Sequence, residues 1–126
     1  MDGEDDLKAR GRTRVDVTCS HGAHGLVVCL SGELDLLTSP ETFATLERWL
    51  RGAGPGEVTI DLTHIAFIDA RGISMLIALR RLAAALDQRL VVRHAHGEVD
   101  TVLRLTGLAE YLGLPTLPEP FVEPHA

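Results

Sequence analysis

The chain lacks the basic surface and the long apolar run that would assign it to several large protein classes. Its 126 residues carry 12 Lys and Arg against 18 Asp and Glu, a net charge of −6. Proteins that bind nucleic acid need a positively charged surface, so this balance disfavours a nucleic-acid partner. No stretch approaches the roughly 20 apolar residues that cross a bilayer, and the polar, acidic beginning does not resemble a secretion signal. We therefore expect a cytoplasmic protein without a membrane partner.

Cysteine is also scarce, because Cys19 and Cys29 are the only two. If the segments around them form a hairpin that turns near Gly22, Cys19 lies opposite Leu26 and Cys29 lies opposite Asp16. The two sulfur atoms would then be roughly 10 Å apart, too far for a disulfide. The simplest interpretation is a pair of thiols without a redox role, since a redox switch would need movement between the two strands.

The motifs of common enzyme classes are missing as well. Ser31, Asp61 and His64 supply the residue types of a hydrolase triad, but no Gly-x-Ser-x-Gly elbow is present. There is no phosphate-binding loop and no dinucleotide fingerprint. Among six histidines, His94 and His96 share one side of a strand but have no obvious third ligand for a metal. We therefore expect a protein that is not an enzyme and that holds no cofactor and no metal.

What the sequence does contain is an ordered succession of short strand and helix patterns. Alternating or β-branched apolar residues predict strands at 14–19, 26–31, 58–62 and 88–93. Apolar residues at helical spacing predict helices at 38–51, 70–86 and 98–106. Thr38 and Glu41 have the spacing of a capping box, and Asp69 is positioned to cap the second helix. The proline-rich end adds at most one short edge strand near Thr116.

Strands that alternate with helices are typical of an α/β fold with a largely parallel sheet. We therefore expect a mixed sheet of four to five strands with three to four helices. Its N-terminal hairpin is antiparallel and the remainder is largely parallel. The length suits one domain with its own core. We place that domain at 13–117, between a disordered N-terminal tail at 1–12 and a flexible C-terminal tail at 118–126.

Two loops follow predicted strands and carry unusual residue combinations. The first is Ser31–Asp35 and the second is Phe67–Ile73, directly before a predicted helix. In an open α/β sheet, the loops at the carboxyl ends of the strands gather at one edge, where binding sites usually form. We therefore expect both loops to face the same partner.

The combination of these segments resembles the STAS-domain family, specifically the anti-sigma factor antagonists. The resemblance runs from about Val15 to Leu114, nearly the whole predicted domain. The segments that carry it are Gly32–Asp35, Val58–Leu62, Phe67–Ile73 and Leu103–Leu108. Each is weak alone, but their order and spacing together are fairly specific. The resemblance implies an STAS-like fold and a role in partner switching, in which the antagonist binds an anti-sigma factor, usually a small serine kinase, and thereby frees a sigma factor.

The resemblance also implies a regulated position, and this sequence departs from it. In the family, the residue after the motif aspartate is typically a serine that the kinase phosphorylates to prevent binding. Here that residue is Ala70, which has no hydroxyl group and so cannot carry the charge of about −1.5 to −2 that a phosphoserine adds. We expect a chain that is permanently competent to bind its partner or is regulated by other means. A diverged protein that has lost its kinase, or an engineered Ser→Ala change, would give the same sequence.

The candidate partner-binding residues are Asp35, Asp69, Ala70, Arg71, Gly72, Ile73 and Met75. Several of them also have a purely structural interpretation. Asp35 could bond its own turn, Asp69 could simply cap the helix, and Arg71 could be an exposed arginine paired with Asp69. Glycine near a helix start costs up to about 1 kcal/mol, so Gly72 indicates close approach of another backbone, either within the fold or from a partner. We expect a monomer or a weak dimer.

The helix that follows Arg71 has more apolar residues than one buried face requires. One stripe is formed by Leu76, Leu79, Ala83 and Leu86. Further apolar residues lie off this stripe, namely Ile73, Met75, Ile77, Ala78 and Leu82. This extra surface predicts either a protein interface or a central helix that is buried on more than one side.

Three other functions fit parts of the sequence. An STAS subunit that docks on a transport ATPase would share the fold and differ only in its partner. A phosphoacceptor receiver domain has a similar length, but it needs an acidic pair after its first strand and a late lysine, whereas the only lysine here is Lys8. A small enzyme would need a pocket lined by groups with perturbed pKa values.

Overall fold

The computed structural model describes residues 15–115, which form a sheet with helices packed against it. The strands are β1 (Asp16–Gly22), β2 (Gly25–Leu34), β3 (Gly56–Ile68) and β4 (Gln88–Arg93). The helices are α2 (Ser39–Ala53), α3 (Ala70–Ala85) and α4 (Gly97–Leu105). The predicted tails at 1–12 and 118–126 and the predicted edge strand near Thr116 lie outside the described residues.

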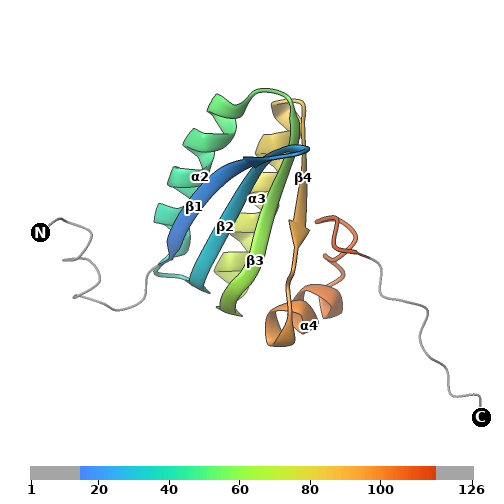
Figure 1. The fold of residues 1–126 in the computed structure, drawn as a ribbon. Helices are drawn as coiled ribbons and strands as arrows, with labels where there is room; N and C mark the ends of the chain where they lie inside the picture. The colour runs from blue at the N-terminus through green and yellow to red at the C-terminus, as the bar shows by residue number, and fades with distance from the viewer. Residues whose placement is uncertain (1–14, 116–126) are drawn as a thin grey trace, which may run out of the picture.

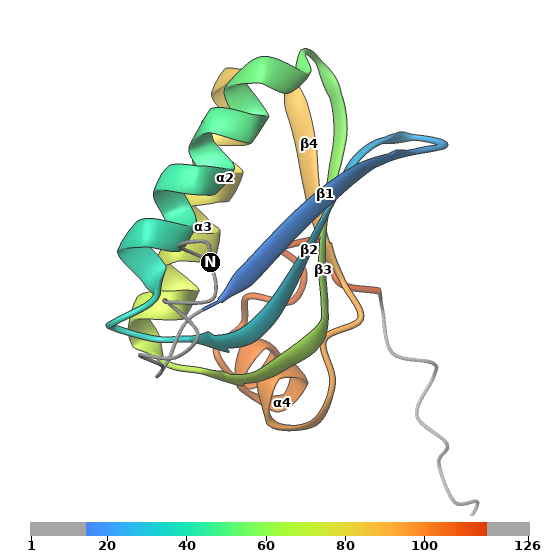
Figure 2. The ribbon, with the colours of Figure 1, turned by 60° about the vertical axis from the view of Figure 1, so that its left-hand side comes forward.

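The sheet has the spatial order β1-β2-β3-β4. Strand β1 pairs with β2 in the antiparallel direction, whereas β2, β3 and β4 are mutually parallel. Figures 1 and 2 show α2 and α3 side by side over one face of this sheet, with α4 beside the carboxyl end of β3. The predicted α/β class and mixed sheet are therefore confirmed.

The core lies between the sheet and helices α2 and α3, because apolar residues alternate along the inner strands. The inward-facing residues are Leu26, Val28 and Leu30 on β2 and Val58, Ile60 and Leu62 on β3. They pack against the buried residues Leu46, Leu50, Leu76, Leu79 and Ala83 of the two helices. Burial of one leucine or isoleucine side chain contributes about 1.5–3 kcal/mol to folding, so this layer holds α3 firmly on the sheet.

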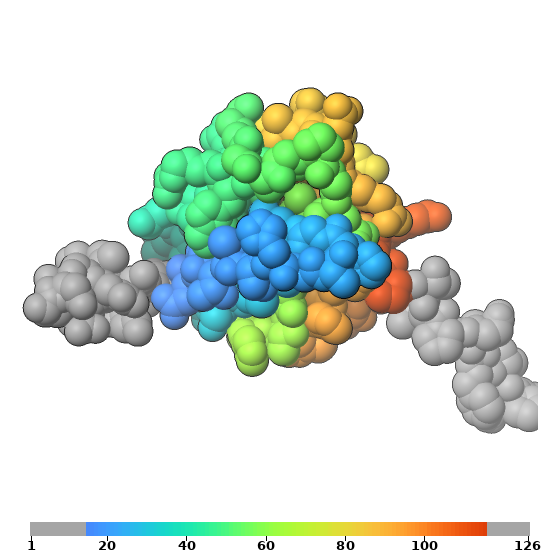
Figure 3. Space-filling view, turned by 45° about the horizontal axis from the view of Figure 1, so that its top comes forward, coloured from blue at the N-terminus to red at the C-terminus, as the bar shows by residue number. Residues whose placement is uncertain are grey.

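The predicted hairpin forms, but its predicted register is wrong. Cys19 lies opposite Val28 instead of Leu26, because the turn is made by the two residues between Gly22 and Gly25. These turn residues are exposed and lie on the surface in the space-filling view (Figure 3). Cys29 pairs with Thr18, so the two cysteines are on opposite faces of the sheet. Both thiols are free, as expected.

Strands β2 and β3 are longer than predicted. The pairing of β2 with β3 continues through Glu33 to Phe67 and Leu34 to Ile68 after two shifts in register. Gly32, which has φ 125°, lies at one of these shifts, and a glycine adopts that conformation without steric cost. Most of the first predicted loop is therefore irregular strand, and the true connection to α2 begins at Asp35.

Candidate functional site

The beginning of α3 is set by the carboxylate of Asp69. This residue has extended backbone angles, and its Oδ1 accepts hydrogen bonds from the backbone N–H groups of Arg71 at 2.8 Å and Gly72 at 3.1 Å. A side-chain cap of this kind stabilises a helix by about 1 kcal/mol. The predicted cap is therefore confirmed, and it determines where the first turn of α3 begins.

The same aspartate also connects α3 to the segment between β2 and α2. Asp69 Oδ2 accepts a hydrogen bond from the backbone N–H of Leu36 at 3.3 Å, and the Asp69 N–H donates to the Leu34 carbonyl at 3.1 Å. Residues more than thirty positions apart thus meet at one end of the sheet (Figure 1). The structure therefore places the two predicted loop segments side by side.

The β2–α2 connection is held in shape by its own polar side chains. Asp35 Oδ1 accepts hydrogen bonds from the N–H groups of Leu37 and Thr38, both at 3.0 Å. The Thr38 hydroxyl donates to the Glu33 carbonyl at 2.7 Å and accepts from the Asp35 N–H at 3.0 Å. The predicted capping box of Thr38 is wrong, because this hydroxyl bonds the turn and not the helix. The Asp35 carboxylate likewise serves its own turn.

Gly72 explains how closely the two segments approach. A Cβ atom at this position would lie 2.4 Å from the Leu34 carbonyl oxygen and 2.7 Å from Ile68 Cγ1. No side chain fits at these distances without a shift of the backbone. The close approach inferred from this glycine therefore occurs within the fold, between α3 and the end of β2.

This packing leaves a set of side chains exposed around the first turn of α3. Leu36 is 55% exposed and Leu37 is 72% exposed, while Ala70 and Arg71 are exposed and Ile73 is half-buried. We call these five residues the docking edge. Phe67, which is 42% exposed, lies at the end of β3 nearby. Exposed apolar side chains gathered in one place are typical of protein interaction sites.

Sequence reasoning missed Leu36 and Leu37, and it placed Phe67 in the second loop without naming it as a contact residue. A signal for the leucines was available, because two apolar residues follow Asp35 directly and precede the helix, outside any helical stripe or strand alternation. Apolar residues in a connection can be either buried or exposed, and the residue pattern alone does not distinguish the two cases. The hydrogen bonds of Asp35 and Asp69 with the backbone of residues 36–38 do distinguish them, because they fix the shape of the turn.

Two predicted site residues have roles that differ from the prediction. Within residues 15–115, the Arg71 guanidinium makes no ion pair or side-chain hydrogen bond, so the expected pairing with Asp69 does not form. Met75 is only 5% exposed and belongs to the core. The extra apolar residues of α3 are buried or half-buried, so this helix is covered on more than one side.

A group of polar side chains lies in the middle of β3, next to the end of β4. Burial by itself raises the pKa of Asp61. Hydrogen bonds from the Thr63 hydroxyl at 2.6 Å and the Thr63 N–H at 2.8 Å, together with nearby His94 and His64, outweigh burial and hold that pKa below its ordinary value. No cluster of three or more metal-ligating side chains occurs among the described residues.

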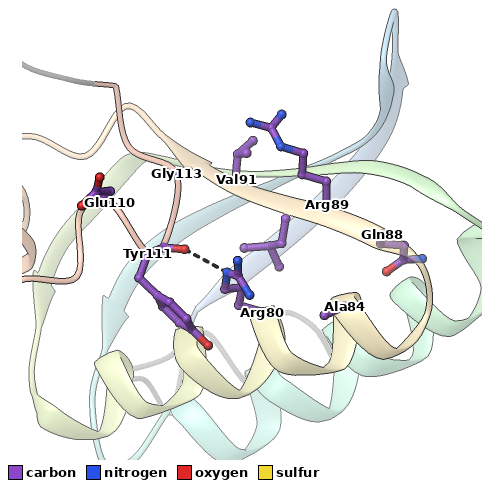
Figure 4. Close-up of a pocket in the computed structure, with 9 residues that line it drawn as sticks. Arg80, Ala84, Gln88, Arg89, Val91, Glu110, Tyr111 and Gly113 are labelled. Carbon is purple, nitrogen blue, oxygen red and sulfur yellow. Dashed lines mark hydrogen bonds between the residues drawn. The ribbon is translucent and has the colours of Figure 1, made fainter.

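A shallow cavity of about 250 Å³ lies between the second half of α3, the beginning of β4 and the segment after α4 (Figure 4). Arg80 closes one side: its guanidinium stacks on the Tyr111 ring at 4.4 Å, and its Nε donates to the Tyr111 carbonyl at 2.9 Å. This cavity is about 15 Å along α3 from the docking edge, given a rise of 1.5 Å per residue. The contacts of Arg80 with Tyr111 connect the segment after α4 to α3.

The comparisons with known proteins agree with this geometry. A family model described as "Mlab, STAS domain" matches residues 17–117. The chain belongs to the STAS-domain family. The resemblance seen in the sequence is thereby confirmed, and Asp69 and Ala70 lie inside the matched STAS region. No helix among residues 15–115 is long and apolar enough to cross a membrane, and none of the curated proteins matches this STAS domain.

Solved structures with the same fold include two bacterial regulators. An anti-sigma factor antagonist from Mycobacterium paratuberculosis is 26% identical, with a TM-score of 0.67 over 82% of this chain and 87% of that chain. An anti-sigma-factor antagonist (STAS) domain protein from Planctomyces limnophilus is 19% identical, with a TM-score of 0.70 over 79% and 88%. The murine anion transporter Slc26a9 is 11% identical, with a TM-score of 0.60 over 90% of this chain and 22% of that chain. The last two likenesses show the fold alone.

Proposed function

We propose that this STAS domain is an anti-sigma factor antagonist, which binds an anti-sigma factor of the serine-kinase type and so releases a sigma factor in the cytoplasm. It acts by binding and not by catalysis. The observation that carries the proposal is the exposed pair Leu36 and Leu37, which Asp69 holds against the first turn of α3. The likeness to the 26% identical anti-sigma factor antagonist from Mycobacterium paratuberculosis supports this assignment.

The docking edge is apolar apart from Arg71, so it suits a partner with a largely apolar contact surface. The sequence resemblance assigns the family's phosphorylated serine to position 70, and Ala70 is the exposed first residue of α3. Because alanine has no hydroxyl group, phosphorylation cannot add charge at this point. Phosphorylation at residue 70 therefore cannot prevent the proposed antagonist from binding its partner.

The partner contact is tested with purified candidate anti-sigma kinases and the variant Leu37→Asp. Loss of one buried leucine contact costs about 2 kcal/mol, so we expect the Kd to rise by about 10- to 100-fold. The matched control is Leu105→Asp, which changes a leucine of similar exposure (82% against 72% for Leu37) at the end of α4. Equal affinities for both variants would contradict a contact through the docking edge.

The phosphorylation state is tested by intact mass after incubation with the same kinases and ATP. We expect no phosphoryl group on residues 68–75 of the natural chain and one on the variant Ala70→Ser. Ser74 is exposed one turn further along α3, so a phosphate found there would show that a different acceptor replaces the missing serine and would contradict constitutive competence.

A second candidate is an STAS subunit that docks on a transport ATPase. The fold shared with part of the Slc26a9 anion transporter shows that a domain of this fold occurs in a transport protein. The two functions differ in their partner, so binding to a purified transport ATPase in place of any anti-sigma factor would select this second function.

A further inference from the structure

Strand β1 forms one margin of the sheet, where its outer edge meets no other strand among residues 15–115. All seven residues from Asp16 to Gly22 pair with β2 on the inner side. Six of the seven are exposed and Val17 is half-buried, and Figure 3 shows the hairpin running along the surface. Because the backbone groups of a strand point alternately to its two sides, β1 presents a row of N–H and C=O groups at this outer edge.

Proteins usually protect such an edge, and β1 carries none of the common protections. Proline, lysine, a β-bulge or a covering segment prevents an edge strand from pairing with another chain. The β1 sequence DVTCSHG contains neither proline nor lysine, and its only carboxylate, Asp16, is at the first position. Its pairing with β2 has no register shift, and other residues of the range 15–115 leave its side chains exposed. The outer edge is therefore open to an extended strand of another molecule.

The opposite margin of the sheet differs, because the segment after α4 covers part of β4. The Val92 N–H donates to the Leu112 carbonyl at 2.8 Å, and the Arg93 guanidinium donates to the Gly113 carbonyl. A strand of another molecule therefore cannot pair along the carboxyl half of β4. Pairing of β1 with β4 of another copy, which would continue into an open filament, is thus blocked. Pairing of β1 with β1 of a second copy remains, and it closes as a two-fold dimer.

Two copies of β1 can pair around a two-fold axis in one full-length register. An antiparallel pair that continues both sheets places the helices of both copies on the same side, so opposite residues must face the same side. In β1 the odd-numbered residues face the helices, as Cys19 does opposite the buried Val28. Odd-numbered residues therefore lie opposite odd-numbered residues, and the axis passes through a residue. The central residue of β1 is Cys19, so pairing of all seven residues places Cys19 opposite the partner's Cys19.

The charges along this edge are compatible with a second copy. Asp16 is the only Asp, Glu, Lys or Arg in β1, and in this register it lies opposite the partner's Gly22, which has no side chain. The Asp16 carboxylates of the two copies are then at opposite ends of the paired strands, roughly 20 Å apart along them. No like charges meet in the contact. The net charge of −6 on each copy still opposes close approach, which weakens the association.

We propose that two copies of this chain associate through β1, which pairs in the antiparallel direction with β1 of the second copy. The two four-stranded sheets then join into one sheet of eight strands. A strand of seven residues is only about 24 Å long, so the contact belongs to the small class, below about 1,200 Å², that is typical of transient association. We therefore expect a reversible dimer with a Kd of roughly 0.1–1 mM.

The register is tested by oxidation with diamide, which accepts two electrons and two protons as two thiols form a disulfide. Opposite residues of an antiparallel pair have Cα atoms about 4.5–5.5 Å apart, which a disulfide can bridge. We expect a covalent dimer from the natural chain and from Cys29→Ser, and none from Cys19→Ser. The same yield of dimer from Cys19→Ser as from the natural chain would overturn the proposal.

A matched control moves the thiol by one residue, in the double variant Cys19→Ser, Ser20→Cys. Position 20 is exposed, as Cys19 is, but in the proposed register residue 20 lies opposite the partner's Thr18. The two introduced thiols would then belong to residues with Cα atoms about 8 Å apart, beyond the reach of a disulfide. We expect crosslinking at least tenfold slower than in the natural chain. An equal rate would show that exposed thiols meet by random collision and would overturn the pairing.

The association itself is tested by sedimentation velocity from 10 μM to 1 mM under reducing conditions. We expect the sedimentation coefficient of the natural chain to rise with concentration. Cys19→Arg places two cations opposite each other and should hold the chain monomeric, whereas Ala84→Arg, at an exposed position on α3, should behave as the natural chain. A natural chain that stays monomeric at 1 mM, or a Cys19→Arg variant that still associates, would overturn the proposal. Strand β1 contains no residue of the docking edge, so these results are independent of binding to an anti-sigma factor.

Discussion

The close packing of Gly72 leads to a prediction with a defined sign and size. In Gly72→Ala, the added methyl group would lie 2.4 Å from the Leu34 carbonyl oxygen, 2.7 Å from Ile68 Cγ1 and 2.8 Å from Leu34 Cβ. Backbone and core atoms cannot move cheaply, so we expect an overpacking cost of about 1–3 kcal/mol. The better helix propensity of alanine offsets about 1 kcal/mol of this cost. The free energy of unfolding should therefore fall by up to about 2 kcal/mol.

Gly52→Ala is the matched control, because Gly52 is also helical, is exposed in α2 and has nothing within 4 Å of an added Cβ. There the propensity gain is not offset, and we expect stabilisation by about 0.5–1 kcal/mol. Urea denaturation followed by circular dichroism measures both free energies. If Gly72→Ala were as stable as Gly52→Ala, the packing of α3 against the end of β2 would be refuted as the reason for this glycine.

Three further substitutions test individual interactions. Asp69→Ala should lower the free energy of unfolding by about 1–2 kcal/mol through loss of the α3 cap. Hydrogen exchange at the Leu36 amide should accelerate, because this N–H donates to Asp69 Oδ2. An unchanged exchange rate would contradict the link between the β2–α2 connection and α3. Gln88→Leu removes the hydrogen bonds from its Nε2 to the Leu50 and Gly54 carbonyls, both 2.8 Å, and should cost about 1–3 kcal/mol in thermal or urea unfolding. The lowered pKa of Asp61 means that its carboxylate stabilises the fold above the ordinary aspartate pKa of about 3.9 and ceases to do so as the pH falls through the folded-state value. The stability difference between wild type and Asp61→Asn should thus shrink from pH 6 to pH 2, and a constant difference would contradict it.

Much of the fold could be predicted from the sequence because burial imposes a period on each element. The alternation of Val58, Ile60 and Leu62 and the helical stripe of Leu76, Leu79 and Ala83 both report a buried face, and the structure places all of these residues in the core. The order of these patterns is sufficient for an α/β sheet with helices over it.

The details that failed depend on contacts between distant segments. The hairpin register follows from a turn that places Gly25 against β3, where an added Cβ would lie 2.2 Å from the Glu57 carbonyl oxygen. The Thr38 hydroxyl had two local uses, and the approach of β2 to α3 favours the turn over the helix cap. Neither choice is encoded in local residue spacing.

The candidate site was predicted in part for the same reason. Asp69 acts through its own neighbours, so a local pattern was enough to predict its cap. The exposure of Leu36 and Leu37 depends on the long-range bond to Asp69 and on the turn made by Asp35, which no periodicity reports. Met75 was predicted as a contact residue from its residue type, but it is buried in the core.

The central claim is that the docking edge at the first turn of α3 is a contact surface for an anti-sigma factor, and that negative charge added at residue 70 prevents the contact. Its most direct test is the Kd of a purified anti-sigma kinase for the natural chain, for Ala70→Glu and for Ala84→Glu, measured by isothermal titration calorimetry. Ala84 is exposed on the same helix, about 21 Å further along its axis. We predict that Ala70→Glu raises the Kd at least tenfold while Ala84→Glu leaves it unchanged. An equal Kd for all three chains, or an equal loss in both variants, would contradict the claim.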